Sequence, residues 1–236
     1  MQAPGGGCAR SLVVGGIPVT TARMSTRNPS RAKASPAANE AAPQSKSDLT
    51  REHLIAAAIK VVGRVGYHKA SSARIAEEAG VSTGLMFYHF GSRQALLDEL
   101  LPALGVQMVA YVTRQIQHLP WGLEHEVAGF RAILTYLDST PEFFWVLSEA
   151  RVYSPLGYAR NFEATLRDYE RALEIQRRKG FLNVSEKDVP LAAHFLTGIR
   201  NYVSHMYLDA RPPKAIPIEE AVALYRQLIS KGLFSV

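Results

Sequence analysis

The chain has one cysteine, Cys8, among its 236 residues. One thiol cannot form an intrachain disulfide, so the sequence indicates a reducing compartment. It contains no run of 18 apolar residues, which predicts that no transmembrane helix is present. Only Arg10 precedes the short, glycine-broken apolar stretch of residues 12–19, so a secretory leader is not expected. We therefore expect a cytoplasmic protein that has no membrane partner.

The sequence also lacks the motifs of common enzymes. There is no nucleophile motif, no phosphate-binding glycine-rich loop and no paired zinc-ligand spacing. His194 and His205 are eleven residues apart, which on one helix separates them by about 16 Å, too far to share a metal ion. We expect no enzyme, no cofactor and no metal site. A helical-bundle enzyme stays open as the weakest alternative.

Strand-like alternation of apolar and polar residues does not stand out, and apolar residues recur at helical spacing instead. The expected fold class is all-α, with about nine helices. We expect two helical domains, an N-terminal one at residues 48–92 and a C-terminal one at residues 93–236. After the first three helices, we expect a helix at residues 92–118, with a kink at Pro102, and another at residues 123–137. One further helix starts at residue 141, and a separate one ends at Gly180. The last two helices are expected at residues 188–208 and 218–231.

Residues 1–47 are rich in Gly, Ala, Pro and Ser and are predicted to be a disordered basic leader, with Met24 as a plausible native start. The formal net charge is +6, and most of the excess lies in this leader, with six Lys/Arg and two Asp/Glu in residues 1–48. Its basic residues could contact DNA phosphates, although a solvated leader without function is the favoured alternative. These residues are Arg23, Arg27, Arg31 and Lys33.

Residues 71–90 read as two short helices joined by a tight turn. Ile75 and Ala76 have helical spacing, and Gly80 stands where a left-handed C-cap residue belongs. Val81 follows as a core residue, and Ser82 can cap the next helix with its hydroxyl. This arrangement meets the requirements of a helix-turn-helix, whose second helix enters the major groove of DNA. An ordinary helical corner has the same spacing and stays open on this evidence alone.

The flanking residues favour the first interpretation, because residues 50–101 resemble the DNA-binding domain of TetR-family transcriptional regulators. The matching residues are Leu54, Ile55, Ala58, Val61, Val62 and Val65, then Gly66 and Tyr67, Ser71, Ile75 and Ala76, residues 79–82, Gly84, residues 88–90 and residues 92–96. The rest of the chain matches this family only in length and helical pattern.

The recognition helix is expected from Ser82 to about His89, with its first turn nearest the base edges. Thr83 can hydrogen-bond a base, Gly84 permits close backbone approach, and Leu85 can contact a thymine methyl. By resemblance, an aromatic pair and a basic residue contact the DNA backbone. The full predicted DNA-binding set is Ser71, Ser72, Ser82, Thr83, Gly84, Leu85, Phe87, Tyr88, His89 and Arg93. We expect the side chains of Met86 and Phe90 to lie in the hydrophobic core.

The resemblance further implies that residues 93–236 bind a small-molecule effector and form a homodimer through the last two helices. The predicted pocket residues are Met108, Tyr111, Phe144, Trp145, Phe162, Tyr202 and Met206, each of which can equally be plain core. We expect a repressor that releases its double-stranded DNA operator when an apolar or amphipathic effector binds. The alternative is a DNA-binding protein that has no small-molecule ligand and responds to a protein partner.

Overall fold

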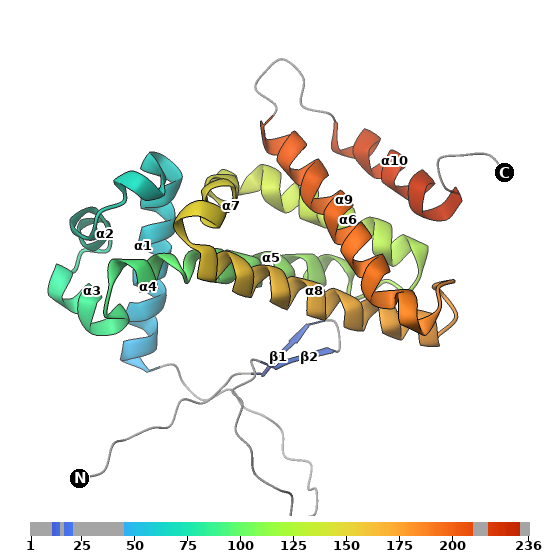
Figure 1. The fold of residues 1–236 in the computed structure, drawn as a ribbon, viewed down its shortest axis with the longest axis horizontal. Coiled ribbons are helices and arrows are strands. Elements are labelled where there is room, and N and C mark those ends of the chain that lie inside the picture. Colours follow the sequence, from blue (N-terminus) through green and yellow to red (C-terminus); the bar gives the residue numbers. More distant parts are fainter. Residues whose placement is uncertain (1–10, 15–16, 21–44, 210–216, 232–236) are drawn as a thin grey trace, which may run out of the picture.

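The structure, a computed structural model, describes residues 11–14, 17–20, 45–209 and 217–231. Ten α-helices and one short 3₁₀ helix, Glu186–Asp188, occur in these ranges. The α-helices are α1 (Lys46–Lys69), α2 (Ser72–Glu78), α3 (Thr83–Phe90), α4 (Arg93–Leu97), α5 (Leu100–Ile116), α6 (Leu123–Ser139), α7 (Pro141–Tyr153), α8 (Pro155–Arg178), α9 (Val189–Asp209) and α10 (Ile218–Lys231). The all-α prediction for the body of the molecule is confirmed (Figure 1).

Two short strands occur in the segment that was predicted to be a disordered leader. Strand β1 (Ser11–Val14) pairs antiparallel with β2 (Ile17–Thr20), and Val14 lies opposite Ile17. The hairpin lies beside α5 and α8 (Figure 1). The leader's basic residues at 23–33 lie outside the described residues, so their contact with DNA stays a prediction.

Side-chain hydrogen bonds at the N-termini of α2 and α3 help to form the helix-turn-helix. The hydroxyl of Ser71 accepts a hydrogen bond from the Arg74 N–H at 3.3 Å, and the hydroxyl of Ser82 accepts one from Leu85 N–H at 3.2 Å. Each bond satisfies an N–H group that has no partner inside its own helix. Gly80 has φ of +63° between α2 and α3, a conformation that is strained for residues with a Cβ. The predicted C-cap glycine is therefore confirmed.

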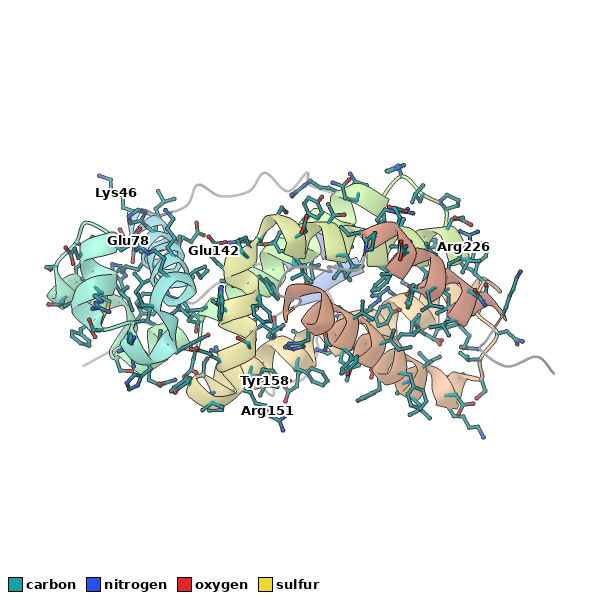
Figure 2. The ribbon with its side chains drawn as sticks, turned by 90° about the horizontal axis from the view of Figure 1, so that it is seen from above. Lys46, Glu78, Glu142, Arg151, Tyr158 and Arg226 are labelled. Atoms are coloured by element: carbon teal, nitrogen blue, oxygen red, sulfur yellow. The ribbon has the colours of Figure 1, made fainter. Side chains whose placement is uncertain are left out.

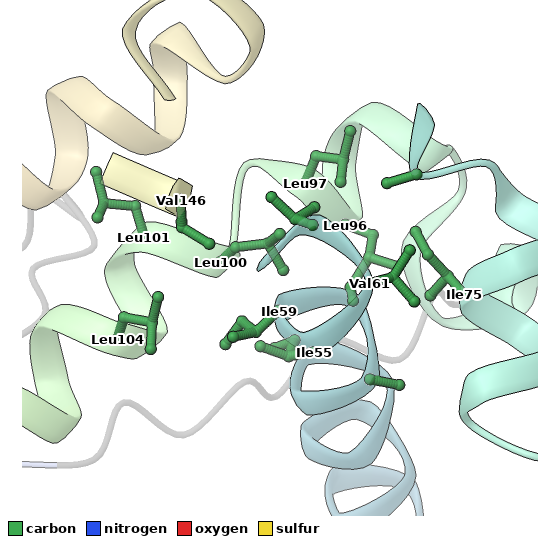
Figure 3. Packing of buried hydrophobic residues seen from close by; sticks show 14 of the residues in the cluster. Ile55, Ile59, Val61, Ile75, Leu96, Leu97, Leu100, Leu101, Leu104 and Val146 are labelled. Atoms are coloured by element: carbon green, nitrogen blue, oxygen red, sulfur yellow. The ribbon is translucent and has the colours of Figure 1, made fainter. Parts of the chain in front are cut away.

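The main hydrophobic core joins the helix-turn-helix to the helices that follow it. Ile55, Ile59 and Val61 of α1 pack with leucines of α4 and α5 and with Val146 of α7 (Figure 3). Burial of such side chains contributes roughly 1.5–3 kcal/mol each. The core therefore crosses the boundary predicted between residues 92 and 93, and the division into two domains stays a prediction.

The break between α4 and α5 differs from the predicted kink at Pro102. The helix is interrupted at Asp98 and Glu99, and Pro102 lies in the first turn of α5, where a missing N–H costs little. A residue with an N–H at position 102 would bond the Asp98 carbonyl, which instead accepts a hydrogen bond from Arg160 of α8 at 2.6 Å. Proline thus moves the break four residues toward the N-terminus of the chain.

Charged groups also join three helices at this break. The Glu99 carboxylate lies 3.4 Å from the Arg51 guanidinium of α1 and 3.1 Å from the Arg160 guanidinium of α8. The Arg51 guanidinium also lies 4.8 Å from the centre of the Phe90 ring. The acidic residue at the break is therefore held from two sides.

Residues 93–116, α4 with α5, are the one stretch in the described ranges that is long and apolar enough to cross a membrane. This stretch is interrupted at Asp98, and its residues pack against α1, α6 and α8. Its buried leucines, at positions 96, 97, 100, 101 and 104, belong to the main core.

The C-terminal helices form a bundle beside the helix-turn-helix. Helices α5 and α8 run side by side, α9 packs on α8 and α6, and α10 packs on α6 (Figure 1). Helix α7 lies between this bundle and α1, with Glu142 near the boundary of the two parts (Figure 2). The approach is close, because a Cβ on Gly63 of α1 would lie 2.8 Å from the Glu142 Cγ.

Candidate functional site

The first turns of α3 present a set of exposed side chains. Met86 is fully buried, and it anchors the helix to the core as predicted. Around it, the predicted contact residues Ser82, Thr83, Gly84, Leu85, Phe87 and Tyr88 are all exposed. Tyr88 is 82% exposed although it is a large aromatic residue. An exposed, capped helix with this composition is suited to docking in the major groove.

The other predicted DNA-binding residues lie at the edges of this surface. Ser71 is exposed at the start of α2, and Ser72 is partly buried. The His89 ring packs edge-on against the Tyr88 ring, with 5.3 Å between ring centres. Helices α2 and α3 pack against each other, so these residues belong to one helix-turn-helix.

Arg93 has a contact that the sequence did not reveal. Its Nε donates a hydrogen bond to the Ala70 carbonyl at 2.6 Å, and its Nη2 donates to the Tyr67 carbonyl. Its guanidinium therefore lies at the C-terminal end of α1, and the predicted contact of Arg93 with phosphate stays a prediction. Arg74 on α2 is exposed and basic, and it was missed because its residue type alone does not distinguish it from a solvated side chain.

A cavity of about 920 Å³ lies among α5, α6, α7, α8 and α9. Of the predicted pocket residues, Met108, Phe162 and Tyr202 line it. Phe143 of α7 also lines it. The cavity is within the size range of small-molecule sites, and its lining is largely apolar toward α7.

Three predicted pocket residues lie outside this cavity. Phe143, Val146 and Ala150 face the core at helical spacing, so Trp145 points the other way and is 51% exposed. Phe144 packs against the Trp145 ring, and Tyr111 packs against the Tyr136 ring in the main core. The side chain of Met206 lies outside the described residues. Apolar residue type alone did not reveal which face of α7 meets the cavity.

A buried charged cluster forms the other end of the cavity. Glu126 Oε1 accepts hydrogen bonds from the Tyr169 and Tyr225 hydroxyls, each at 2.6 Å, and from Arg200 Nη2. The Arg200 guanidinium also lies 4.3 Å from the centre of the Tyr169 ring. Burial raises the pKa of Glu126, but the charge of Arg200 and these hydrogen bonds outweigh it and lower the pKa overall. Glu126 is therefore held as a carboxylate.

Helix α7 connects the cavity to the helix-turn-helix. Phe143 and Leu147 line the cavity, and Glu149 on the same helix accepts a hydrogen bond from the Tyr67 N–H at 2.8 Å. Tyr67 follows Gly66, whose φ of +77° interrupts α1. A side chain at position 66 would also meet the Glu149 carboxylate, because a Cβ there would lie 3.0 Å from Oε1. Neither Glu149 nor its contact was predicted, since the two residues are 82 positions apart.

Helices α9 and α10 expose apolar side chains. Leu191 and Phe195 of α9 and Leu224 of α10 are 54%, 65% and 53% exposed. Leu228 is only partly buried by its own chain. Apolar residues that are exposed together indicate a surface that another protein chain covers.

The amino-acid sequence of the chain is similar to sequences of known proteins. Residues 54–100 match the family model of bacterial regulatory proteins, tetR family. The HTH-type transcriptional regulator BetI of Vibrio vulnificus is 36% identical over 194 residues, covering 78% of this chain and 93% of that protein. BetI of Vibrio atlanticus is 40% identical over 73 residues, covering 31% of this chain and about a third of that relative (36%).

Solved structures have the same fold. The fatty acid degradation regulator FadR from Bacillus halodurans has a TM-score of 0.66 at 20% identity, covering 79% of this chain and 97% of that chain. FadR from Bacillus subtilis in complex with stearoyl-CoA has a TM-score of 0.66 at 17% identity, covering 78% and 99%. With the match to the Vibrio vulnificus regulator along most of both chains, these findings show that the chain belongs to the TetR family of bacterial regulatory proteins.

Proposed function

We propose that this protein is a homodimeric, DNA-binding transcriptional repressor that releases its operator when a small molecule enters the cavity among α5–α9. The observation that carries the proposal is that one helix, α7, contacts both the cavity and the end of α1. The exposed α3 surface supplies the DNA contact, and membership of the TetR family supports the same assignment.

DNA contact is divided between phosphate and bases. The Tyr88 hydroxyl is suited to a phosphate oxygen, and Thr83 at the start of α3 is suited to a base edge. Arg93 acts indirectly, because it holds the loop between α1 and α2 and thereby the start of α2. Two copies joined through α9 and α10 place two α3 helices on successive half-sites about 34–36 Å apart or slightly more.

Ligand control follows from the position of α7. A molecule that presses on Phe143 or Leu147 changes the position of α7, and Glu149 transfers that change to Tyr67. The helix-turn-helix is then displaced relative to its partner copy, so its spacing no longer matches the DNA. The ligand has an effect only because it binds the two arrangements with different affinities.

The test begins with selection of bound sequences from genomic fragments, followed by titration of variants on the selected operator. Tyr88→Phe should weaken binding to all operator variants by a similar factor. Thr83→Ala should remove preference at one base pair, at about 1–3 kcal/mol. Val106→Ala, an exposed apolar change on α5, is the matched control and should leave affinity unchanged. Unchanged affinity for both α3 variants would contradict the assignment of this helix.

A further inference from the structure

The cavity differs at its two ends, and this difference restricts the ligand. Toward α7 the lining is largely apolar, with Ile133 and Leu137 of α6 beside Phe143 and Leu147. At the opposite end, Glu126 and Arg200 form an ion pair that is 11% and 14% exposed. Glu126 and Leu137 are eleven residues apart on α6, so the two ends lie about 16 Å apart. A ligand that fills the cavity has a long apolar part and one polar part.

The polar end offers a hydrogen-bond donor that is not used. Arg200 lines the cavity, and its Nε–H is buried and has no hydrogen-bond acceptor among the described residues. Its Nη2 is already bonded to Glu126. A buried donor that lacks an acceptor is costly, and a bound acceptor removes that cost. Among the groups that line the cavity, the guanidinium is therefore the one that has a buried donor without an acceptor in the described ranges.

A cationic head group is disfavoured at the polar end of the cavity. The Glu126 oxygen Oε1 already accepts three hydrogen bonds, and the Asp168 carboxylate pairs with Arg171 at 3.3 Å. The Trp121 ring is contacted by His125, with 4.5 Å between ring centres, and by the Lys179 ammonium at 5.6 Å. The Trp121 ring and these two carboxylates, which could attract a quaternary ammonium, are thus already engaged.

An anionic head group is also disfavoured. Two carboxylates, Glu126 and Asp168, line the cavity with one arginine, Arg200, and two histidines, His125 and His205. An anion at Arg200 would lie beside the Glu126 carboxylate and would have to share its counter-charge. Burying an ion without a partner of its own is costly, whereas an uncharged acceptor gives up little hydration.

We propose that the effector is an uncharged amphipath, an ester or ketone in chemical class, whose carbonyl oxygen accepts a hydrogen bond from Arg200 and whose apolar part extends to Phe143 and Leu147. The binding of this effector is inferred from the cavity alone. Its effect on the operator rests on the proposed function. It assigns Arg200 as the residue that selects the head group.

The experiment measures binding to the full-length protein by calorimetry, with no DNA present. Three probes have the same eight-carbon chain: methyl octanoate, octanoate and octyltrimethylammonium. Methyl octanoate is expected to bind most tightly. Arg200→Lys keeps a cation beside Glu126 but changes the donor geometry, and it is expected to weaken methyl octanoate by about tenfold. Arg226→Lys, in an exposed ion pair with Glu124, is the control and should bind like the unmodified protein.

Several results would overturn the proposal. They are tighter binding of octanoate or of octyltrimethylammonium, no binding of the ester, and an ester affinity that Arg200→Lys leaves unchanged. Because Arg200→Lys could misfold, the double variant Arg200→Met with Glu126→Gln removes the pair without leaving a buried charge and should show the same loss. If the ester binds through Arg200 but does not release the operator, the head-group assignment stands and ligand control fails.

Discussion

Replacing Glu149 by alanine is the sharpest test of how the cavity and the DNA-binding helices are coupled. The carboxylate accepts the Tyr67 N–H at 2.8 Å, and Tyr67 is fully buried. Glu149→Ala leaves this N–H without its acceptor. A hydrogen bond to a charged group contributes about 1.5–3 kcal/mol, so we expect the free energy of unfolding to fall by about that amount. Glu149→Gln keeps an oxygen acceptor and should recover part of it.

Glu149→Ala should change how strongly the effector weakens operator binding, and it should not change the affinity of the protein for the effector. Glu149 does not line the cavity, so binding of an effector without DNA should stay unchanged. The factor by which that effector weakens operator binding should drop by about tenfold, because allosteric coupling is typically 1–3 kcal/mol and this contact supplies a similar amount.

The assay is operator binding by fluorescence anisotropy with and without effector, together with urea unfolding to show that each variant is folded. Ser148→Ala, on the adjacent and exposed position of α7, is the control. A folded Glu149→Ala protein that keeps full coupling would refute the role of this contact. Equal loss in Ser148→Ala would show that α7 as a whole, not the carboxylate, is responsible.

Three further outcomes are expected. Phe195→Glu, at a side chain that is 65% exposed on α9, should give a monomer by light scattering and weaken operator binding, and a stable dimer would contradict the α9–α10 interface. The pKa of Glu126 is lowered from 4.5 in the folded protein, so its stabilisation is present above about pH 4.5 and is lost as the pH falls further. Unfolding free energies should therefore decrease more steeply below pH 5 for the unmodified protein than for Glu126→Gln, and parallel curves would disprove this. Gly157→Ala should destabilise by about 1–3 kcal/mol, because its Cβ would lie 2.5 Å from the Asp98 carbonyl oxygen, while Gly198→Ala in open space should stabilise by about 0.5–1 kcal/mol. Thermal unfolding of both variants, followed by calorimetry, tests these two opposite changes in stability.

Local chemistry explains what the sequence could predict. The caps at Ser71 and Ser82, the left-handed Gly80 and the end of α8 at Gly180 each depend on a few neighbouring residues. Helix α10 begins at Ile218 and ends at Lys231 as expected, because apolar residues recur at helical spacing over this range. The exposed face of α3 followed from the same spacing and from the resemblance.

Long-range pairing explains what the sequence could not predict. Arg93 and Arg200 look alike as isolated arginines, yet one donates to carbonyls at the end of α1 and the other is buried beside Glu126, 74 positions away. Trp145 was predicted to line the pocket, but its residue type does not say in which direction its side chain points. Which face of α7 meets the cavity is decided by α1, since α1 takes the face that contains Val146 and Ala150.

The Glu99 bridge between Arg51 and Arg160 also affects how solution measurements on this protein are interpreted. The three side chains are partly exposed, at 25%, 41% and 51%, so dissolved ions can screen their attraction. Added salt then loosens the connection of α1 to α8 at the same time as it competes for DNA phosphates. The salt dependence of operator affinity therefore has two sources here, and its slope overstates the number of phosphate contacts. A salt titration on a Glu99→Gln protein, whose bridge is already neutral, would give the count of phosphates alone.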